Sequence, residues 1–246
     1  MASVTVDQDD RAVSLRLDRP EKRNALDPEM AEGIREALRA HRDTPLPLVL
    51  SSTTPGMFVA GSDIAELAER SVEDNLARGN AGLFQELEDH PWPTVAVVDG
   101  PALGGGCELA LACDLRVASS RSTWGLPEVR LGLIPGAGGL WRLPRLVGWS
   151  AAVDLIMTGR RIDGAAARDI GLAHRLADPD DLDRALGELL DELAKTSISA
   201  VRLAKEAMRV DPDHRRLVDA LAQAVCISGD DAQERLHAFL DRSKDR

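Results

Sequence analysis

The sequence has no tyrosine, few aromatic side chains and only three cysteines among its 246 residues. An odd and sparse set of cysteines does not form a disulfide framework, and it suits a reducing compartment. Cys107, Cys113 and Cys226 form no metal-ligand spacing with the five histidines. The sequence therefore predicts no metal site.

Positive charge is also scarce, since 41 acidic residues against 30 lysines and arginines give a formal net charge of -11. Nucleic acids and anionic membrane surfaces attract a positive face, so this balance argues against general binding to either. No apolar run is long enough to cross a bilayer, and the opening "MASVTVDQDD" carries no secretory signal. We therefore expect a cytoplasmic protein that binds neither nucleic acid nor membrane.

Strand and helix patterns alternate through the first three quarters of the chain. Alternating apolar residues at 13–17 predict a strand, and Asp27 with Pro28 predicts the start of a helix that runs to about Arg42. Further strands are predicted at 47–52, 94–100, 114–119 and near 172–177, and further helices from about 62 and at 81–90, 107–113, 137–147, 150–158 and 164–170. This order indicates an α/β architecture with crossover connections.

From about Asp180 the strand pattern disappears. Four stretches with helical periodicity follow, at 181–194, 199–210, 215–228 and 231–242. We therefore divide the chain into an α/β core over residues 1–178 and a helical region over residues 179–246. The apolar faces of these helices suit packing on another subunit.

Three stretches place glycines beside polar or acidic residues: "FVAGSDI" (58–64), "ALGGGCEL" (102–109) and "WGLPEVRLGLIPGAGG" (124–139). In the first two, a loop of small residues leads directly into a predicted helix. The N–H groups at a helix N-terminus are unpaired and stabilise a developing anion. Two of them that converge on one oxygen would form an oxyanion hole.

Two glutamates in these stretches, Glu108 and Glu128, are candidates for proton transfer, because burial raises the pKa of a carboxyl group. A structural interpretation stays open for each. Glu108 could cap its own helix while the glycines allow two backbones to approach. Glu128 could be a surface residue that pairs with Arg130 or Arg142.

Other chemistries fit the sequence less well. Paired carboxylates also serve glycoside hydrolysis, but sugar platforms need aromatic rings, and only 3% of the chain is aromatic. The sequence contains no recognisable Ser/His/Asp arrangement of the kind used in nucleophilic catalysis. The stretch "GLIPGAGG" is not a phosphate-binding GxGxxG after a strand.

Six landmarks follow one another along nearly the whole chain: "RPEKRNAL", "FVAGSDI", "GPALGGGCELALACD", "WGLPEVRLGLIPGAGG", "RLVG" and "MTGR". Through this ordered set the sequence resembles the crotonase (enoyl-CoA hydratase/isomerase) superfamily. The resemblance implies a spiral of ββα turns, with the catalytic core in residues 1–178 and a C-terminal helical trimerisation region in residues 179–246. It also implies a homotrimer or a dimer of trimers.

The resemblance implies an oxyanion hole from the N–H groups of Ser62 and Gly105, with Glu108 and Glu128 as catalytic carboxylates. The implied reaction adds water across the 2,3 double bond of a 2-enoyl-CoA to give a 3-hydroxyacyl-CoA, in fatty acid or related acyl-CoA degradation. We assign water activation mainly to Glu108 and proton delivery to Glu128. The coenzyme A thioester is the substrate, and no separate cofactor is implied.

The same resemblance implies the remaining binding residues. The acyl pocket is expected at Trp124, Leu126, Leu133 and Trp141, where Leu126 replaces a common glutamine. Leu140 and Trp141 replace the frequent Thr-Gln, which could reshape that pocket. Coenzyme A is expected to contact Lys22, Arg23, Ala25, Ala60, Ile64, Phe239 and Arg242. The last two are expected to reach the coenzyme A bound to a neighbouring subunit. Alternatively, Lys22, Arg23, Phe239 and Arg242 are all solvated surface residues.

Three alternatives concern the function itself. An enoyl-CoA isomerase needs only one carboxylate, so the glutamate pair favours a hydratase. Thioester hydrolysis, decarboxylation and ring cleavage in the same superfamily usually replace one or both glutamates. A non-enzymatic RNA-binding homologue would need a basic stretch, whereas the C-terminal helices alternate positive and negative residues.

Overall fold

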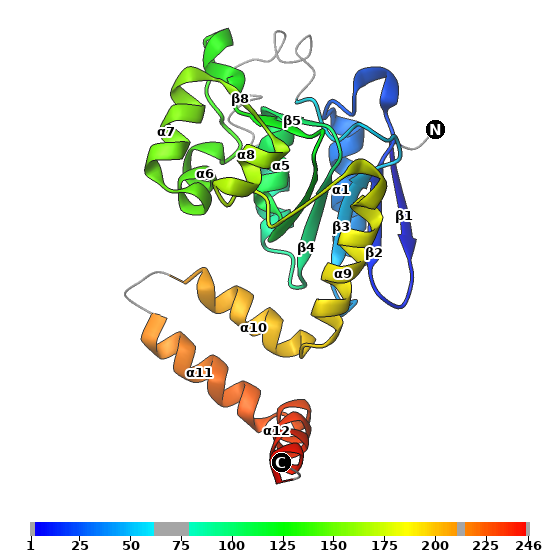
Figure 1. The fold of residues 1–246 in the computed structure, drawn as a ribbon, viewed down its shortest axis with the longest axis vertical. Coiled ribbons are helices and arrows are strands. Elements are labelled where there is room, and N and C mark those ends of the chain that lie inside the picture. Colours follow the sequence, from blue (N-terminus) through cyan, green and yellow to red (C-terminus); the bar gives the residue numbers. More distant parts are fainter. Residues whose placement is uncertain (1–2, 62–78, 211–214, 245–246) are drawn as a thin grey trace.

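A sheet of six strands forms the centre of the protein (Figure 1). The computed structural model describes residues 3–61, 79–210 and 215–244. In spatial order the strands are β1 (Val4–Gln8), β2 (Val13–Leu17), β3 (Leu48–Ser52), β4 (Thr94–Val98), β6 (Leu115–Ser119) and β9 (Arg175–Ala177). Within this sheet, as far as the structure describes it, only the β1–β2 pair is antiparallel. The parallel pairs require crossover connections, as the alternation of elements predicted.

A second sheet contains three short strands, β5 (Pro101–Leu103), β7 (Thr123–Gly125) and β8 (Arg161–Asp163). Strand β4 leads into β5 and then α5 (Gly105–Ala112), and β6 leads into β7 and then α6 (Gly139–Val147). Each time the chain forms two strands and then a helix. This repeat is the ββα turn that the sequence predicted.

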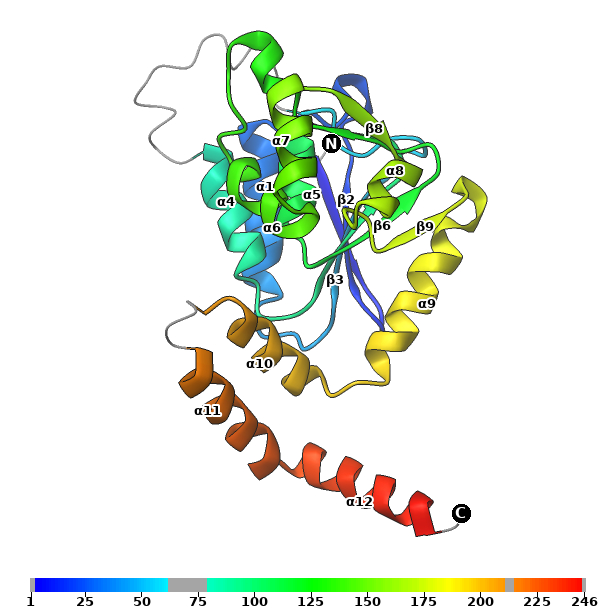
Figure 2. The ribbon, with the colours of Figure 1, turned by 60° about the vertical axis from the view of Figure 1, so that its left-hand side comes forward.

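Helices cover one face of the large sheet and bury the main core (Figure 2). The Asp27 side chain caps α1 (Pro28–Ala40) by accepting the Met30 N–H, and Met30, Ile34 and Leu38 face the core. All eight residues of α5 are buried. The other helices of this part are α4 (Gly79–Glu88), α7 (Trp149–Thr158) and α8 (Gly164–Asp169), with short 3-10 helices at Pro20–Lys22, Pro127–Leu131 and Pro179–Asp181.

The opposite face of the sheet packs against α9 (Leu182–Ala194). Its Leu182, Ala185, Leu189 and Leu190 form a second apolar cluster with valines of β3, β4 and β6. Helix α9 therefore packs directly on the sheet, although it follows residue 178. The division of the chain at 178/179 stays a prediction.

The last three helices are α10 (Ile198–Met208), α11 (Arg215–Ser228) and α12 (Asp230–Lys244). Figures 1 and 2 show α10 along one end of the core, while α11 and α12 extend away from it. Leu221, Val225, Ile227 and Leu236 are exposed on these two helices. The helical region is as predicted, and its role in trimerisation stays a prediction. Among the described helices, none is both long and apolar enough for a membrane span.

Candidate active site

The small-residue loop at 58–61 lies directly against the start of α5. The Val59 N–H donates to Pro101 O at 3.1 Å, and the Leu103 N–H donates to Val59 O at 3.2 Å. A Cβ atom on Gly106 would lie 2.0 Å from Val59 O. Only glycine fits there, and this contact brings together the two glycine stretches that the sequence singled out.

Gly105 is the first residue of α5, and Gly104 precedes it with a positive φ of 54°. An N–H at this position has no intrahelical carbonyl to bond, and it lies at the positive end of the helix dipole. The second predicted oxyanion donor, Ser62, lies outside the described residues. Its pairing with Gly105 stays a prediction.

Glu108 lies in the first turn of α5 and is only 3% exposed. Its Oε1 accepts hydrogen bonds from the Ala137 N–H at 2.8 Å and the Gly139 N–H at 2.9 Å. Burial raises the pKa of the Glu108 carboxyl, while these two bonds and the charge of Arg142 oppose the increase. The Glu108 carboxylate is therefore bonded to the turn before α6. The structural interpretation had instead expected it to cap its own helix.

Glu128 lies on the 3-10 helix Pro127–Leu131, next to Gly104. A Cβ atom on Gly104 would lie 3.2 Å from Glu128 Oε1. The Oε2 atom of Glu128 is buried and has no hydrogen-bond partner among the described residues. Burial raises the pKa of Glu128 to about 7, and the negative charge of Glu108 adds to the increase. The two carboxylates thus influence each other beside the N-terminus of α5.

The two arginines proposed as surface partners of Glu128 are bonded elsewhere. Arg130 Nε donates to Thr158 O at 3.2 Å, and Arg142 forms an ion pair with Glu88. The interpretation of Glu128 as a surface residue paired with Arg130 or Arg142 is therefore wrong.

The residues predicted for the acyl pocket have different environments. Leu126 is fully buried. Both its Cδ1 atom and Glu108 Oε1 lie beside Gly139, since a Cβ atom added to Gly139 would be 3.0 Å from the first and 3.1 Å from the second. Trp124 is also fully buried, and its Nε1–H donates to Ser122 Oγ at 3.0 Å. Leu133 and Trp141 are 47% and 38% exposed in the single chain. The structure therefore brings Leu126 to the carboxylates, and the acyl-binding roles stay predictions.

Most of the residues predicted to bind coenzyme A in the first part of the chain lie together. Lys22 ends the 3-10 helix Pro20–Lys22, and Arg23 and Ala25 lie in the turn that follows it. Arg23 O accepts the Ala60 N–H at 3.1 Å. Ile64 and the side chains of Phe239 and Arg242 lie outside the described residues. The backbone of the latter two belongs to α12.

Asn24 is a positioning residue that the sequence analysis missed. It is fully buried with a φ of 53°, and its Nδ2–H donates to Phe58 O at 2.8 Å. Its Oδ1 accepts the Arg19 N–H at 2.8 Å. Asn24 thus fixes the predicted coenzyme A turn to the loop at 58–61. Its residue type was the one signal in the sequence that could have indicated this role, because asparagine tolerates the left-handed region of backbone conformation better than most residues.

Among the described residues, no three His, Cys, Asp or Glu side chains lie close enough together to hold a metal ion.

The chain is similar to known proteins along nearly its whole length. The family model described as "Enoyl-CoA hydratase/isomerase" matches residues 8–246. The chain is 36% identical to a crotonyl-CoA hydratase of Syntrophomonas wolfei, over 98% of this chain and 96% of that protein. It is 40% identical to mouse mitochondrial enoyl-CoA hydratase domain-containing protein 2, over 92% of this chain and 80% of that protein. A crystal structure of an enoyl-CoA hydratase from Bacillus anthracis superposes with a TM-score of 0.90 at 33% identity, covering 98% and 96% of the two chains.

Proposed function

Because the chain belongs to the enoyl-CoA hydratase/isomerase family, we propose that it is a hydro-lyase that adds water to a 2-enoyl-CoA. The product is a 3-hydroxyacyl-CoA. One observation supports this proposal most directly: the buried Glu108 and the partly buried Glu128 lie beside the N-terminus of a glycine-initiated helix.

The first requirement of the reaction is to stabilise an enolate. Addition of water at Cβ moves electrons onto the thioester oxygen, and the negative charge must be held there. The N–H of Gly105 lies at the start of α5 with no intrahelical acceptor, so it suits this oxygen. Ser62 would supply the second donor. The apolar surroundings of the site strengthen each such hydrogen bond.

The second requirement is a pair of groups that move protons. Glu108 is held by two backbone N–H groups, which stabilise its ionised form and fix its orientation. As a carboxylate it would take a proton from the attacking water. Glu128, whose pKa is raised to about 7, retains a proton near neutral pH and would deliver it to Cα.

The remaining parts of the proposal concern binding and assembly. Lys22, Arg23, Ala25 and Ala60 would hold coenzyme A together with Ile64, and cations there suit its phosphates. Helix α12 extends away from the core of its own chain (Figure 2), so Phe239 and Arg242 would reach a neighbour's ligand in a homotrimer or a dimer of trimers. We place the enzyme in the cytoplasm, in acyl-CoA degradation.

A direct assay tests the proposed reaction. The purified protein is given 2-enoyl-CoA esters of increasing chain length, starting with crotonyl-CoA, and loss of the conjugated-thioester absorbance is followed. We expect turnover with a 3-hydroxyacyl-CoA as the product, identified by mass. If no ester of the series gains water while a 3-enoyl-CoA is converted to the 2-enoyl isomer, the protein is an isomerase.

A further inference from the structure

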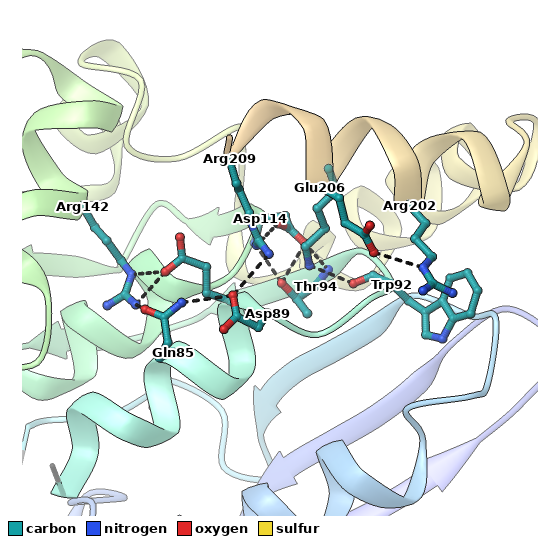
Figure 3. A network of polar contacts seen from close by, with 11 residues as sticks. Gln85, Asp89, Trp92, Thr94, Asp114, Arg142, Arg202, Glu206 and Arg209 are labelled. Atoms are coloured by element: carbon teal, nitrogen blue, oxygen red, sulfur yellow. Dashed lines mark hydrogen bonds and ion pairs between the residues drawn. The ribbon is translucent and has the colours of Figure 1, made fainter. Parts of the chain in front are cut away.

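Arg142 joins the end of α4, where Figure 3 shows it beside Gln85, to the turn that precedes α6. Its side chain is only 4% exposed. Nε and Nη2 both lie close to Glu88 Oε2, at 2.8 and 2.6 Å, and Nη1 donates to Ala137 O at 2.9 Å. The guanidinium group therefore has an ionic partner on α4 and a backbone partner in the turn.

The backbone of Ala137 connects this arginine with the candidate active site. Its carbonyl accepts from Arg142, while its N–H donates to Glu108 Oε1. The N–H of Arg142 also donates to Gly138 O at 2.9 Å. Residues 137–139 are thus held by Arg142 on one side and hold the Glu108 carboxylate on the other.

We infer that Arg142, fixed by Glu88, is a positioning residue that sets the orientation and protonation of Glu108. The inference rests on the proposed function, in which Glu108 acts as the base toward water. Arg142 does not touch the reacting atoms in this account. It acts through two peptide N–H groups and through its charge.

The charges around Glu108 give this role an electrostatic part. Burial disfavours the ionised form of Glu108. Glu128, on the 3-10 helix Pro127–Leu131, responds to the negative charge of Glu108, which adds to the increase of its own pKa. Among the described groups, Arg142 on α6 is the charged side chain that favours ionised Glu108. Cys107, the neighbour of Glu108 on α5, is a thiol whose pKa is raised to about 12 by burial, so it stays neutral. Loss of Arg142 should therefore raise the pH at which Glu108 ionises.

The chain offers a matched control on the same helix. The guanidinium groups of Arg142 and Arg145 both lie over the Trp141 ring, at 4.0 and 4.9 Å from its centroid. Arg145 is exposed, whereas Arg142 is buried against the turn. Arg145→Met thus removes a charge and a ring contact of the same kind and leaves the turn intact.

The experiment compares the hydration kinetics of Arg142→Met, Arg142→Lys and Arg145→Met over a range of pH. We expect Arg142→Met to lower kcat by up to about 10²-fold, because small misplacements of a reacting group can cost that much, with little change in KM. The acidic limb of its pH profile should move to higher pH.

Arg142→Lys keeps the positive charge but not the two-pronged geometry of the guanidinium group. It should therefore bring the acidic limb back toward its wild-type pH more fully than it restores kcat. Arg145→Met should match the wild type. A wild-type kcat and pH profile in folded Arg142→Met would overturn the inference.

Removing Arg142 leaves the partly buried Glu88 without this ionic partner, which can unfold the chain. A second variant, Glu88→Met/Arg142→Met, replaces the whole pair by apolar side chains of similar size. It should fold and show the same loss of kcat and the same shifted limb. A folded double variant with wild-type kinetics would likewise overturn the role of Arg142.

A spectroscopic measurement separates this inference from the proposed function. The carboxyl band of Glu108 is identified in infrared difference spectra by its absence in Glu108→Gln, and is titrated in the wild type and in Arg142→Met. We expect the midpoint to be higher in the variant, whichever reaction the protein catalyses. An unchanged midpoint would refute the electrostatic role even in an active hydratase, whereas failed hydration with a shifted midpoint would refute only the proposed function.

Discussion

The Oε1 atom of Glu108 lies 2.9 Å from the backbone nitrogen of Gly139, and the two residues are 31 positions apart in the sequence. The second N–H on the same oxygen comes from Ala137. Helix α5 thus carries the carboxylate, while the turn before α6 sets its orientation. A change at Glu108 that keeps an acceptor oxygen can preserve this geometry and remove only the proton chemistry.

Glu108→Gln is such a change, because its amide oxygen can accept both N–H groups. We expect hydration to fall about 10²–10⁴-fold, the usual range for general acid–base catalysis. Isomerisation of a 3-enoyl-CoA moves one proton between Cα and Cγ and can use Glu128 alone, so any such activity should fall less. Both reactions are measured on the same preparation. Hydration that persists while isomerisation disappears would reverse the assignment of Glu108.

The variant Glu108→Gln/Glu128→Gln provides an internal check. If the two carboxylates act on one water as a unit, its loss of activity should be much smaller than the product of the two single losses. Losses that multiply would indicate that the glutamates act in independent steps.

Gly106→Ala tests the contact between the two glycine stretches. The added Cβ would lie 2.0 Å from Val59 O, a backbone atom that cannot rotate away. We expect a loss of at least about 1–3 kcal/mol in the free energy of unfolding, as for overpacked cores, and a lower kcat because α5 carries Gly105 and Glu108. Urea denaturation and hydration kinetics measure the two effects.

Gly136→Ala is the matched control, since the nearest atom to its added Cβ would be Ile134 O at 3.7 Å, an ordinary contact. It should change neither quantity appreciably. Equal effects of the two substitutions would mean that the contact with Val59 has no special importance.

Local signals predicted much of this fold and part of its site. The Asp27–Pro28 start and apolar spacing of α1 suffice because a cap and a helical period are properties of neighbouring residues. The pairing of glycine loops with Glu108 and Glu128 was likewise visible, since glycine ahead of an apolar helix is a local anomaly. The structure places both carboxyl groups in buried surroundings with raised pKa values.

The remainder depends on contacts between distant residues. Strands β5 and β8 have three residues each, too few to display an alternating pattern. Helix α5 begins at Gly105, ahead of the apolar run at 107, because packing against Val59 outweighs the poor helix propensity of glycine. The partners of Glu108 at Ala137 and Gly139, and the bond from Arg142 to Ala137, arise only when α5 and α6 meet.

A buried histidine should make stability depend on pH. His90 is 2% exposed, and its Nε2 has no hydrogen-bond partner in the part of the chain that the structure describes. Burial, together with the nearby charge of Lys205, lowers the pKa of His90 to about 4 from 6.5. Between these values the unfolded chain binds a proton that the folded chain does not. Stability is therefore highest above pH 6.5 and falls with decreasing pH, by up to about 1.4 kcal/mol per unit from this residue.

His90→Leu removes this contribution, so the free energy of unfolding should depend less steeply on pH between 4 and 6.5. Urea denaturation at a series of pH values measures the slope. His237→Gln, on the exposed surface of α12, should leave the slope as in the wild type. If His90→Leu has the wild-type slope, the acid sensitivity comes from other groups.

The raised pKa of Glu128 predicts the alkaline side of the activity profile. As the proposed acid, Glu128 works only while protonated, and burial with the charge of Glu108 raises its pKa to about 7. Glu108 works as a base only while ionised. The value of kcat/KM, which reports groups of the free enzyme, should therefore fall above about pH 7 and also at acidic pH. In Glu128→Gln the residual activity should lose the alkaline limb and keep the acidic one. If the alkaline limb survives in that variant, another group delivers the proton to Cα.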